Sequence, residues 1–215
     1  MADQDSRAGA RYYTEAILDY TQRVHASHDA GLTRAFATPA GVPAIQLGMS
    51  EGKLVHLLVR MIGARKAVEV GTLVGYSGTQ IARALAPGGH LWTCEFDPRH
   101  AELARANFAA AGVGDRVTIV VGPGVETLPT LNAHGPFDVV FIDADKTNYA
   151  HYGAWAIANL RPGGLVLGDN AFLFGQLCDD DERAHAMRRF HEGVAAACDS
   201  VCIPTPDGLV LGIKR

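Results

Sequence analysis

The amino-acid sequence predicts an α/β protein in which helices cover both faces of a mostly parallel sheet, with an antiparallel hairpin at the C-terminal end. Three observations predict this class. Short apolar runs of strand length alternate with segments of helical spacing between residues 67 and 197. The runs are apolar throughout, as strands buried on both faces are. The segment SVCIPTPDGLVLGIK (200–214) joins two apolar stretches through a TPDG turn, which is typical of a hairpin.

The chain before these alternating elements predicts a helix and a linker. Apolar residues recur at helical spacing between Tyr12 and Val24. The stretch ATPAGVPAIQLGM that follows is rich in proline and glycine, which is typical of a linker or a lid. Ser50 is placed to cap a helix over 51–62, whose leucines share one face. We expect one domain over 1–215, with the N-terminal helix and lid in 1–48 and the core in 49–215.

Each later element has its own signal. The first apolar run, AVEV, ends at Gly71, and Pro98 stands in the first turn of its helix, where proline is tolerated. An RPGG sequence stops the helix that ends at Leu160, and the acids of 179–182 suit the start of a helix. The predicted strands cover 67–70, 90–96, 116–122, 137–144 and 165–170. The predicted helices cover 77–85, 98–111, 125–131, 149–160 and 180–197.

Composition and charge exclude several classes of function. The 19 Lys and Arg against 23 Asp and Glu give a net charge of −4, which argues against a general nucleic-acid binder. No apolar run is long enough to span a membrane, and the N-terminus MADQDSRAGARYY lacks the apolar segment of a secretory signal. We therefore expect no nucleic-acid partner and no membrane association. The four cysteines form no CxxC pair, so we expect free thiols in a reducing cytoplasm rather than a zinc site.

Residues that bind ligands are expected beyond the carboxyl ends of the strands. The turn EVGTLVGYS follows the first strand, and its glycines, Gly71 and Gly75, let the backbone approach a ligand closely. The spacing is neither GxGxxG nor a phosphate loop nor a nucleophile elbow, which indicates a nucleoside without a pyrophosphate. Glu95 ends the second strand, where an acid can accept both ribose hydroxyls, and Gly124 leaves room for a flat ring such as adenine. The alternatives are an ordinary strand–helix turn and a helix-capping acid.

The most specific pattern consists of FIDADKTNY (141–149) and the DN pair at 169–170, each at the end of a predicted strand. Asp143, Asp169 and Asn170 offer three oxygen ligands at one sheet edge, with no cysteine or histidine nearby in sequence. Oxygen donors select a hard cation, Mg²⁺ or else Ca²⁺ or Mn²⁺, over zinc or copper. The alternative is that Asp143 caps the next helix and the DN pair begins a turn. None of the nine histidines stands at a position that would indicate pairing with a nucleophile, so none is assigned a catalytic role.

These motifs resemble the cation-dependent class I O-methyltransferases that use S-adenosylmethionine, the caffeoyl-CoA and catechol O-methyltransferase-like group. The likeness runs from about Ile45 to the C-terminus, and FIDADK followed by DN is specific to this group. The resemblance implies a Rossmann-like class I methyltransferase fold with a seven-stranded, mostly parallel sheet. It also implies a homodimer, with the N-terminal helix near the acceptor site.

The resemblance further implies roles for individual residues. The S-adenosylmethionine site would be lined by Leu47, Glu69, Gly71, Thr72, Gly75, Ser77, Glu95, Phe96, Gly124, Asp143 and Asp145. The divalent cation would be held by Asp143, Asp169 and Asn170. Lys146 would lie beside the acceptor oxygen as a base or an electrostatic partner, with Asp143 as the second catalytic residue.

The sequence departs from the family pattern near the expected acceptor. Leu173 stands where the family often has Trp, Phe174 where plant members have a substrate-contacting Asn, and Lys53 where the family has Gln. These changes leave the cofactor and metal residues intact. An apolar wall of Phe172, Leu173 and Phe174 is expected, which favours an aromatic acceptor without a bulky polar tail.

The expected function is therefore methylation of a hydroxyl on a catechol-like or other vicinal-diol aromatic small molecule. A tRNA hydroxyuridine O-methyltransferase, which the same family includes, is the first alternative, with Arg60, Arg65 and Lys66 as a local basic patch. A nicotinamide-dependent oxidoreductase is a second alternative, against which the missing GxGxxG argues. A non-catalytic nucleotide-binding subunit is a third, although such a protein need not keep all four of Asp143, Lys146, Asp169 and Asn170.

Overall fold

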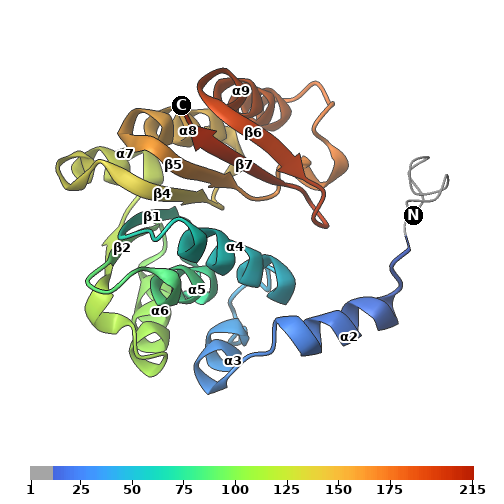
Figure 1. Ribbon diagram of the computed structural model, residues 1–215, viewed down its shortest axis with the longest axis vertical. Coiled ribbons are helices and arrows are strands. Elements are labelled where there is room, and N and C mark those ends of the chain that lie inside the picture. The colour runs from blue at the N-terminus through green and yellow to red at the C-terminus, as the bar shows by residue number, and fades with distance from the viewer. Residues whose placement is uncertain (1–11) are drawn as a thin grey trace.

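The computed structural model describes residues 12–215, and its centre is one seven-stranded sheet in the order β3-β2-β1-β4-β5-β7-β6 (Figure 1). The strands are β1 (Lys66–Val70), β2 (His90–Glu95), β3 (Val117–Val121), β4 (Phe137–Ile142), β5 (Leu160–Gly168), β6 (Cys198–Ile203) and β7 (Leu209–Lys214). The first five strands pair in parallel, and β7 runs antiparallel to both β5 and β6. The predicted fold class is confirmed, hairpin included. The expectation about a secretory signal concerns residues 1–13, of which 1–11 lie outside the described residues.

Helices cover both faces of this sheet. One face carries α4 (Met49–Met61), α5 (Tyr76–Ala84) and α6 (Pro98–Ala110), and the other carries α7 (Gly124–Thr130), α8 (Tyr149–Asn159) and α9 (Glu182–Ala197). Single turns of 3₁₀-helix cover Gly114–Arg116, Asn132–His134, Lys146–Asn148 and Leu173–Gly175.

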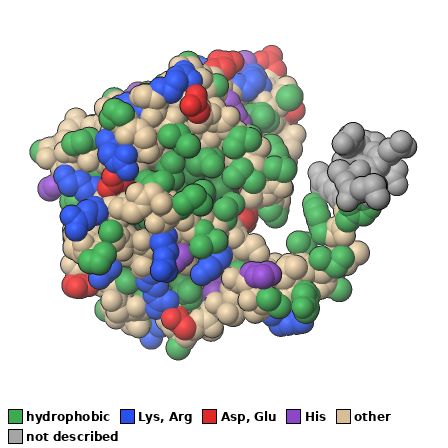
Figure 2. Space-filling view, in the orientation of Figure 1, with side chains coloured by type: hydrophobic (Ala, Val, Ile, Leu, Met, Phe, Trp, Pro, Cys, Tyr) green, Lys and Arg blue, Asp and Glu red, His purple; other side chains and the backbone are tan. Residues whose placement is uncertain are grey.

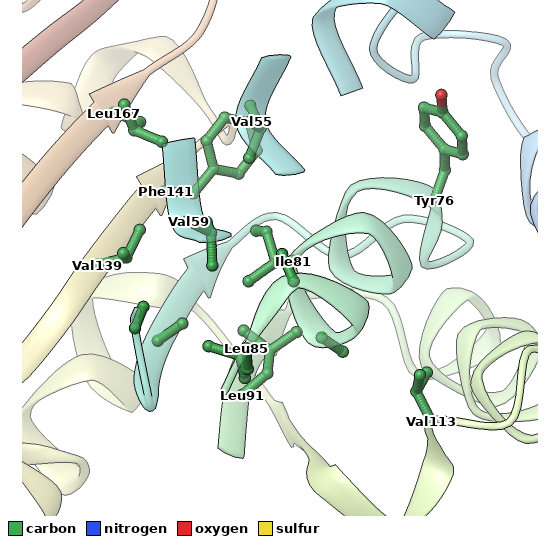
Figure 3. Packing of buried hydrophobic residues seen from close by; sticks show 14 of the residues in the cluster. Val55, Val59, Tyr76, Ile81, Leu85, Leu91, Val113, Val139, Phe141 and Leu167 are labelled. Carbon is green, nitrogen blue, oxygen red and sulfur yellow. The ribbon is translucent and has the colours of Figure 1, made fainter. Parts of the chain in front are cut away.

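Two apolar cores result from the alternation of side chains along each strand. Val139 and Phe141 of β4 face the α4–α5 side, where they join Val55, Val59 and Ile81 (Figure 3). The intervening residues of β4 face the α8–α9 side and pack with the aromatic side chains there. Each large apolar side chain that is fully buried contributes about 1.5–3 kcal/mol to the stability of the fold. The two cores therefore fix the positions of the strands and of the strand ends.

The N-terminal part contains α2 (Glu15–His25), as predicted, and α3 (Ala30–Phe36), which was not. The helix α3 contains a glycine and a threonine, both weak helix formers. It forms because Asp29 accepts the N–H of Leu32 at its start (2.9 Å) and because Leu32 and Ala35 are buried against the body. The expected cap of α4 was also wrong. Gly48, rather than Ser50, precedes this helix, and its N–H donates to Glu51.

All four cysteines lie in the described residues and none forms a disulfide, as expected; Cys94 and Cys198 are buried. Among residues 12–215, no helix has both the length and the hydropathy that crossing a bilayer requires.

Gly71 stands where the ends of β1 and β4 meet, and only glycine fits there. Its φ is +100°, and a Cβ built on it would lie 1.9 Å from the backbone oxygen of Asp143. We expect Gly71→Ala to lower the free energy of unfolding by about 3 kcal/mol or more, measured by urea denaturation. Gly88 provides the control, because its φ is +76° but no atom lies within 4 Å of its built Cβ. Gly88→Ala should cost about 1–2 kcal/mol from backbone strain alone. Equal losses in the two variants would show that the contact with Asp143 does not matter.

Candidate functional site

A cavity of about 990 Å³ opens at the carboxyl ends of the parallel strands, a size that suits a small-molecule site. Eleven of the residues selected from the sequence lie in its wall: Leu47, Gly71, Thr72, Ser77, Glu95, Phe96, Gly124, Asp143, Asp145, Lys146 and Asn170. Segments far apart in the sequence therefore meet here, as the topology of the sheet predicts.

Three selected residues lie behind this wall instead. Glu69 is completely buried, and its carboxylate accepts hydrogen bonds from Ser77 Oγ (2.5 Å) and Thr93 Oγ1 (2.6 Å). Gly75 begins α5 with a φ of +87° and packs against the ring of Phe108. Asp169 is only 5 % exposed. Any role of Glu69 and Gly75 toward a ligand is thus indirect, through the shape of the turn after β1.

Glu95 does more than line the cavity. One carboxylate oxygen accepts the N–H groups of Thr72 (3.1 Å) and Leu73 (2.7 Å), and the other accepts the N–H of Asp97 (2.9 Å). The ring nitrogen Nδ1 of His100 also lies 3.5 Å from this second oxygen. A carboxylate has about four acceptor sites, so these neighbours leave at most roughly one for a ligand hydroxyl. The end of β2 thereby holds the turn that follows β1, a role that the residue pattern did not indicate.

Asp143 and Asp169 extend from adjacent strand ends. The N–H of Asp143 donates to Val70 and that of Asp169 donates to Ile142, so the two acids continue the sheet ladder across β1, β4 and β5. Burial, together with the charge of Asp143, raises the pKa of Asp169 to about 8. Burial also raises the pKa of Asp143, while the ammonium of Lys146 opposes this shift. Two neighbouring carboxylates, one of which raises the pKa of the other by its charge, make a favourable place for a cation.

The donor chemistry at this point fits a hard cation. Asp143, Asp169 and the side-chain oxygen of Asn170 are all oxygen donors, which Mg²⁺, Ca²⁺ and Mn²⁺ prefer. Within residues 12–215, no group of three or more His, Cys, Asp or Glu side chains is arranged to hold a metal. The candidate set contains two such side chains, and its third member is the amide of Asn170.

Lys146 lies inside the site and not on the surface. Its side chain is 12 % exposed, and Nζ lies 3.2 Å from Oδ1 of Asp143 and 3.2 Å from the hydroxyl of Tyr149. The ammonium also lies 4.7 Å from the centre of the Tyr149 ring, within cation–π range. The lysine is therefore fixed beside the acidic pair, at the cavity wall.

Strained backbone is concentrated at the cavity. In the described part of the chain, the non-glycine residues with positive φ are Leu73, Asn170, Leu173 and Phe174, and all but Leu173 line the cavity. Such strain persists at functional sites when the surroundings enforce it. In the segment after β5 the hairpin turn enforces it, because Asp207 accepts the N–H of Phe174 at Oδ1 (2.8 Å) and the N–H of Phe172 at its backbone oxygen (2.8 Å).

The apolar wall expected from Phe172, Leu173 and Phe174 is only partly present. Phe174 lines the cavity and is 63 % exposed, but Leu173 is completely buried in the core on the α8–α9 side. Phe172 does not line the cavity either; its ring packs over Gly208. The reason is the tight 3₁₀ turn over Leu173–Gly175, whose positive φ angles turn neighbouring side chains in different directions.

Other residues of the cavity wall were not selected from the sequence. They include Pro43, Ala44, Ile45 and Gln46 of the lid segment and Asn148 and Tyr152 after the FIDADK motif. The lid residues are held in place by Gln46, whose Nε2 donates to the backbone oxygen of Phe36 at the end of α3 (2.5 Å). No residue pattern signals such a contact between an unpredicted helix and a loop.

The basic patch considered for an RNA substrate lies elsewhere. Arg65 and Lys66 stand at the amino end of β1, where both N–H groups donate to Asp138 (2.8 Å). This edge of the sheet is opposite the cavity. The geometry thus separates these basic residues from the acidic site.

The buried Glu69 predicts a pH dependence of stability. Burial raises its pKa from 4.5 to about 8, so between these values the folded state retains a proton that the unfolded state has lost. The free energy of unfolding of the unliganded protein should therefore fall as the pH rises from about 4.5 to about 8. Glu69→Gln should remove up to about 1.4 kcal/mol per pH unit of that slope in urea titrations. Glu102→Gln, at an exposed surface ion pair, should leave the slope unchanged; identical slopes in both variants would contradict the assignment.

Comparison with known proteins decides the family. Residues 28–215 match the family model described as O-methyltransferase. The chain belongs to the O-methyltransferase family. A protein of Mycobacterium tuberculosis named catechol O-methyltransferase is 42 % identical over 212 residues, which cover 94 % of each chain. Caffeoyl-CoA O-methyltransferase 2 of Zea mays is 33 % identical over 176 residues, or 75 % of this chain and 67 % of the maize protein.

The fold agrees with this family. The crystal structure of the O-methyltransferase TomG from Streptomyces achromogenes, in complex with SAM, superposes with a TM-score of 0.87, at 33 % identity and with full coverage of both chains. The expected Rossmann-like methyltransferase fold and enzyme class are thus confirmed for this O-methyltransferase. Both findings argue against the nicotinamide-dependent oxidoreductase and against the non-catalytic subunit.

Proposed function

We propose that this O-methyltransferase transfers the methyl group of S-adenosylmethionine to a hydroxyl of a catechol-like or other vicinal-diol aromatic small molecule, with the help of a divalent cation. The observation that carries the proposal is the pair of partly buried Asp143 and buried Asp169 with Lys146 beside it, at the wall of a cavity of ligand size. The relative named catechol O-methyltransferase supports the acceptor class.

In this proposal, the turn after β1 and the end of β2 hold the cofactor. Gly71 and Thr72 line the cavity at this turn, Glu95 would accept a ribose hydroxyl, and the Asp145 carboxylate would bind the ammonium of the cofactor. Gly124 leaves space for the adenine. When bound, S-adenosylmethionine supplies a methyl group on a sulfonium sulfur. That sulfur becomes a neutral thioether when the methyl group is transferred.

Asp143, Asp169 and Asn170 would hold the cation, with Mg²⁺ as the first choice and Ca²⁺ or Mn²⁺ as others. A phenol ionises near pH 10 and is a poor nucleophile at neutral pH, and a bound dication lowers that pKa by stabilising the oxyanion. Lys146 contributes a positive charge as an ammonium or, as a neutral amine, takes the hydroxyl proton at Nζ, as the acceptor oxygen bonds to the methyl carbon and the carbon–sulfur bond breaks.

The mouth of the cavity favours an aromatic acceptor. Ile45 and Phe174 both line it and are 69 % and 63 % exposed, so apolar surface surrounds the entrance. Large exposed apolar side chains at a cavity mouth are available to contact a ring and to exclude water from the reacting oxygen.

A methylation screen of catechols and monophenols, with and without MgCl₂ and analysed by mass spectrometry, tests the proposal. We expect products from vicinal diols in the presence of magnesium and little product from monophenols. Salt-sensitive binding and methylation of bulk tRNA, with no catechol product, would replace the proposal by the RNA alternative.

A homodimer is part of the proposal, and α2 supports it. This helix extends from the body, and hydrophobic side chains are visible along it in Figure 2. It contains no buried residue, and Ile17, Leu18, Tyr20 and Val24 are between 41 % and 59 % exposed. An apolar helix face of this kind is stabilised when a second copy covers it.

Light scattering after size-exclusion chromatography tests this part. We expect the mass of a dimer at micromolar concentration and a shift toward the monomer for Ile17→Glu, whereas Asp19→Lys on the same helix should have little effect. A monomeric wild-type protein would contradict it. We also propose a cytoplasmic location, which the free thiols of the four cysteines support.

A further inference from the structure

Two buried tyrosines of α8 have their hydroxyl groups in the candidate site. Tyr149 and Tyr152 are three residues apart, so they share one face of the helix. They are 0 % and 2 % exposed, and α8 begins directly after the Lys146–Asn148 turn. The mechanism above assigns neither of them a role.

Tyr149 contacts the half of the site that contains Lys146. Its hydroxyl accepts a hydrogen bond from Lys146 Nζ (3.2 Å) and lies 2.7 Å from the backbone oxygen of Asp169 and 3.1 Å from that of Ile142. The single hydroxyl proton is donated to these two carbonyls, so the oxygen lone pairs remain directed at the lysine. With Asp143 on the other side of Nζ, the ammonium is held between two fixed oxygen atoms.

Tyr152 contacts the other half. Its hydroxyl donates to Oδ1 of Asp145 (2.5 Å), while Asn148 Nδ2 donates to Oδ2 of the same carboxylate (2.6 Å). The ring of Tyr152 lines the cavity and packs on Gly124, where a built Cβ would lie 2.9 Å from the ring. One side chain therefore connects the carboxylate assigned to the cofactor ammonium with the turn assigned to the adenine.

We propose that Tyr149 and Tyr152 are positioning residues for different halves of the reaction: Tyr149 orients Lys146 toward the acceptor, and Tyr152 orients Asp145 and the Gly124 turn toward the cofactor. The inference rests on the proposed function, which places the acceptor at Lys146 and the cofactor at Asp145. It adds that the hydroxyl groups, and not only the rings, are needed, and that their effects are separable.

Tyr149→Phe and Tyr152→Phe test this, because each removes a hydroxyl and retains the ring that packs in the core. Affinity for S-adenosylhomocysteine is measured by titration calorimetry, and kcat is measured with saturating S-adenosylmethionine, a catechol and MgCl₂. Loss of a hydrogen bond to a charged group typically changes a binding constant or a rate constant by about tenfold or more. We expect Tyr152→Phe to weaken S-adenosylhomocysteine binding about tenfold with kcat within about twofold of wild type, and Tyr149→Phe to lower kcat about tenfold with binding within about twofold.

Two further variants separate positioning from a general structural effect. In a Lys146→Met background, Tyr149→Phe should cause no additional loss of kcat, because the side chain that it orients is absent. Asn148→Ala removes a second donor to Asp145, and leaves the weaker one from Thr147 Oγ1 (3.1 Å), without changing the core. It should weaken S-adenosylhomocysteine binding with kcat retained.

Parallel losses of binding and kcat in both tyrosine variants, or an additive loss in the Lys146→Met background, would overturn the inference. So would unchanged binding in both Tyr152→Phe and Asn148→Ala. A wild-type protein that binds S-adenosylhomocysteine but methylates no catechol would refute the proposed function and the Tyr149 assignment with it, while the calorimetry would still decide the Tyr152 assignment.

Discussion

Lys146→Met is expected to lower kcat by about 10²–10⁴-fold while affinity for S-adenosylhomocysteine stays near that of the wild type. The side chains have similar length, but methionine carries no charge and cannot accept a proton. Nζ lies 3.2 Å from Asp143, and the lysine side chain is only 12 % exposed. Because the position is largely closed to solvent, water cannot readily compensate for the lost charge. Steady-state kinetics with a catechol and magnesium measure the rate, and calorimetry measures the affinity.

Two controls sharpen the Lys146 result. Lys66→Met removes a lysine at the opposite edge of the sheet, where Nζ donates to the backbone oxygen of His134, and it should change kcat by less than about twofold. Lys146→Arg retains the charge but introduces a group that does not lose its proton in proteins. Activity retained in Lys146→Arg would identify an electrostatic role, and activity lost in both variants would favour a base. A wild-type rate in Lys146→Met would remove the lysine from the mechanism.

Removal of divalent cations is expected to have an effect of similar size. Excess EDTA should abolish methylation and MgCl₂ should restore it, because the phenol oxygen then loses the charge that stabilises its anion. Asp169→Asn should reproduce the loss of turnover, with kcat lower by about 10²-fold or more, and excess magnesium should not restore it. Activity that survives complete chelation would contradict a metal role.

Asp169→Asn also predicts a gain in stability that distinguishes a ligand from a residue of the core. Burial and the charge of Asp143 raise the pKa of Asp169, so the metal-free protein contains an unfavourable pair of neighbouring acids. An amide of the same shape relieves this repulsion. At pH 8 and in EDTA, the free energy of unfolding should rise by about 1 kcal/mol in urea denaturation, a stability gain at the expense of function. A lower stability under these conditions would indicate that Asp169 is needed mainly for the fold.

Most of the fold could be predicted because its signals are local. The apolar runs of the buried strands and the acids and proline at helix starts depend on few neighbouring residues. The exceptions depend on packing between distant segments. Helix α3 forms from weak helix formers because Leu32 and Ala35 are buried, and β5 begins at Leu160 because the proline and glycines after it fit an irregular pairing with β4.

The candidate site also contains residues that could be predicted from the sequence and residues that could not. Asp143 and Asp169 could be predicted to meet because the strands before them are parallel and adjacent, which places their ends side by side. Tyr149 and Tyr152 were missed because aromatic residues at helical spacing usually indicate core, and only the structure shows where their hydroxyl groups lie. The turn at Leu173 was interpreted wrongly because positive φ angles redirect side chains in a way that residue order does not reveal.

The contact between Asp207 and the amide of Phe174 ties the rim of the entrance to the last hairpin of the chain. Most of the residues proposed to bind the nucleoside, in contrast, lie at the ends of β1 and β2 and in the turns after them, with Gly124 and Asp145 after β3 and β4. If the proposed site is correct, changes of preferred acceptor can therefore accumulate near the C-terminus with little effect on binding of the methyl donor. A fold divided in this manner is well suited to diversification after gene duplication, and exchange of the hairpin and the loop that it supports between relatives offers a direct route to new acceptors.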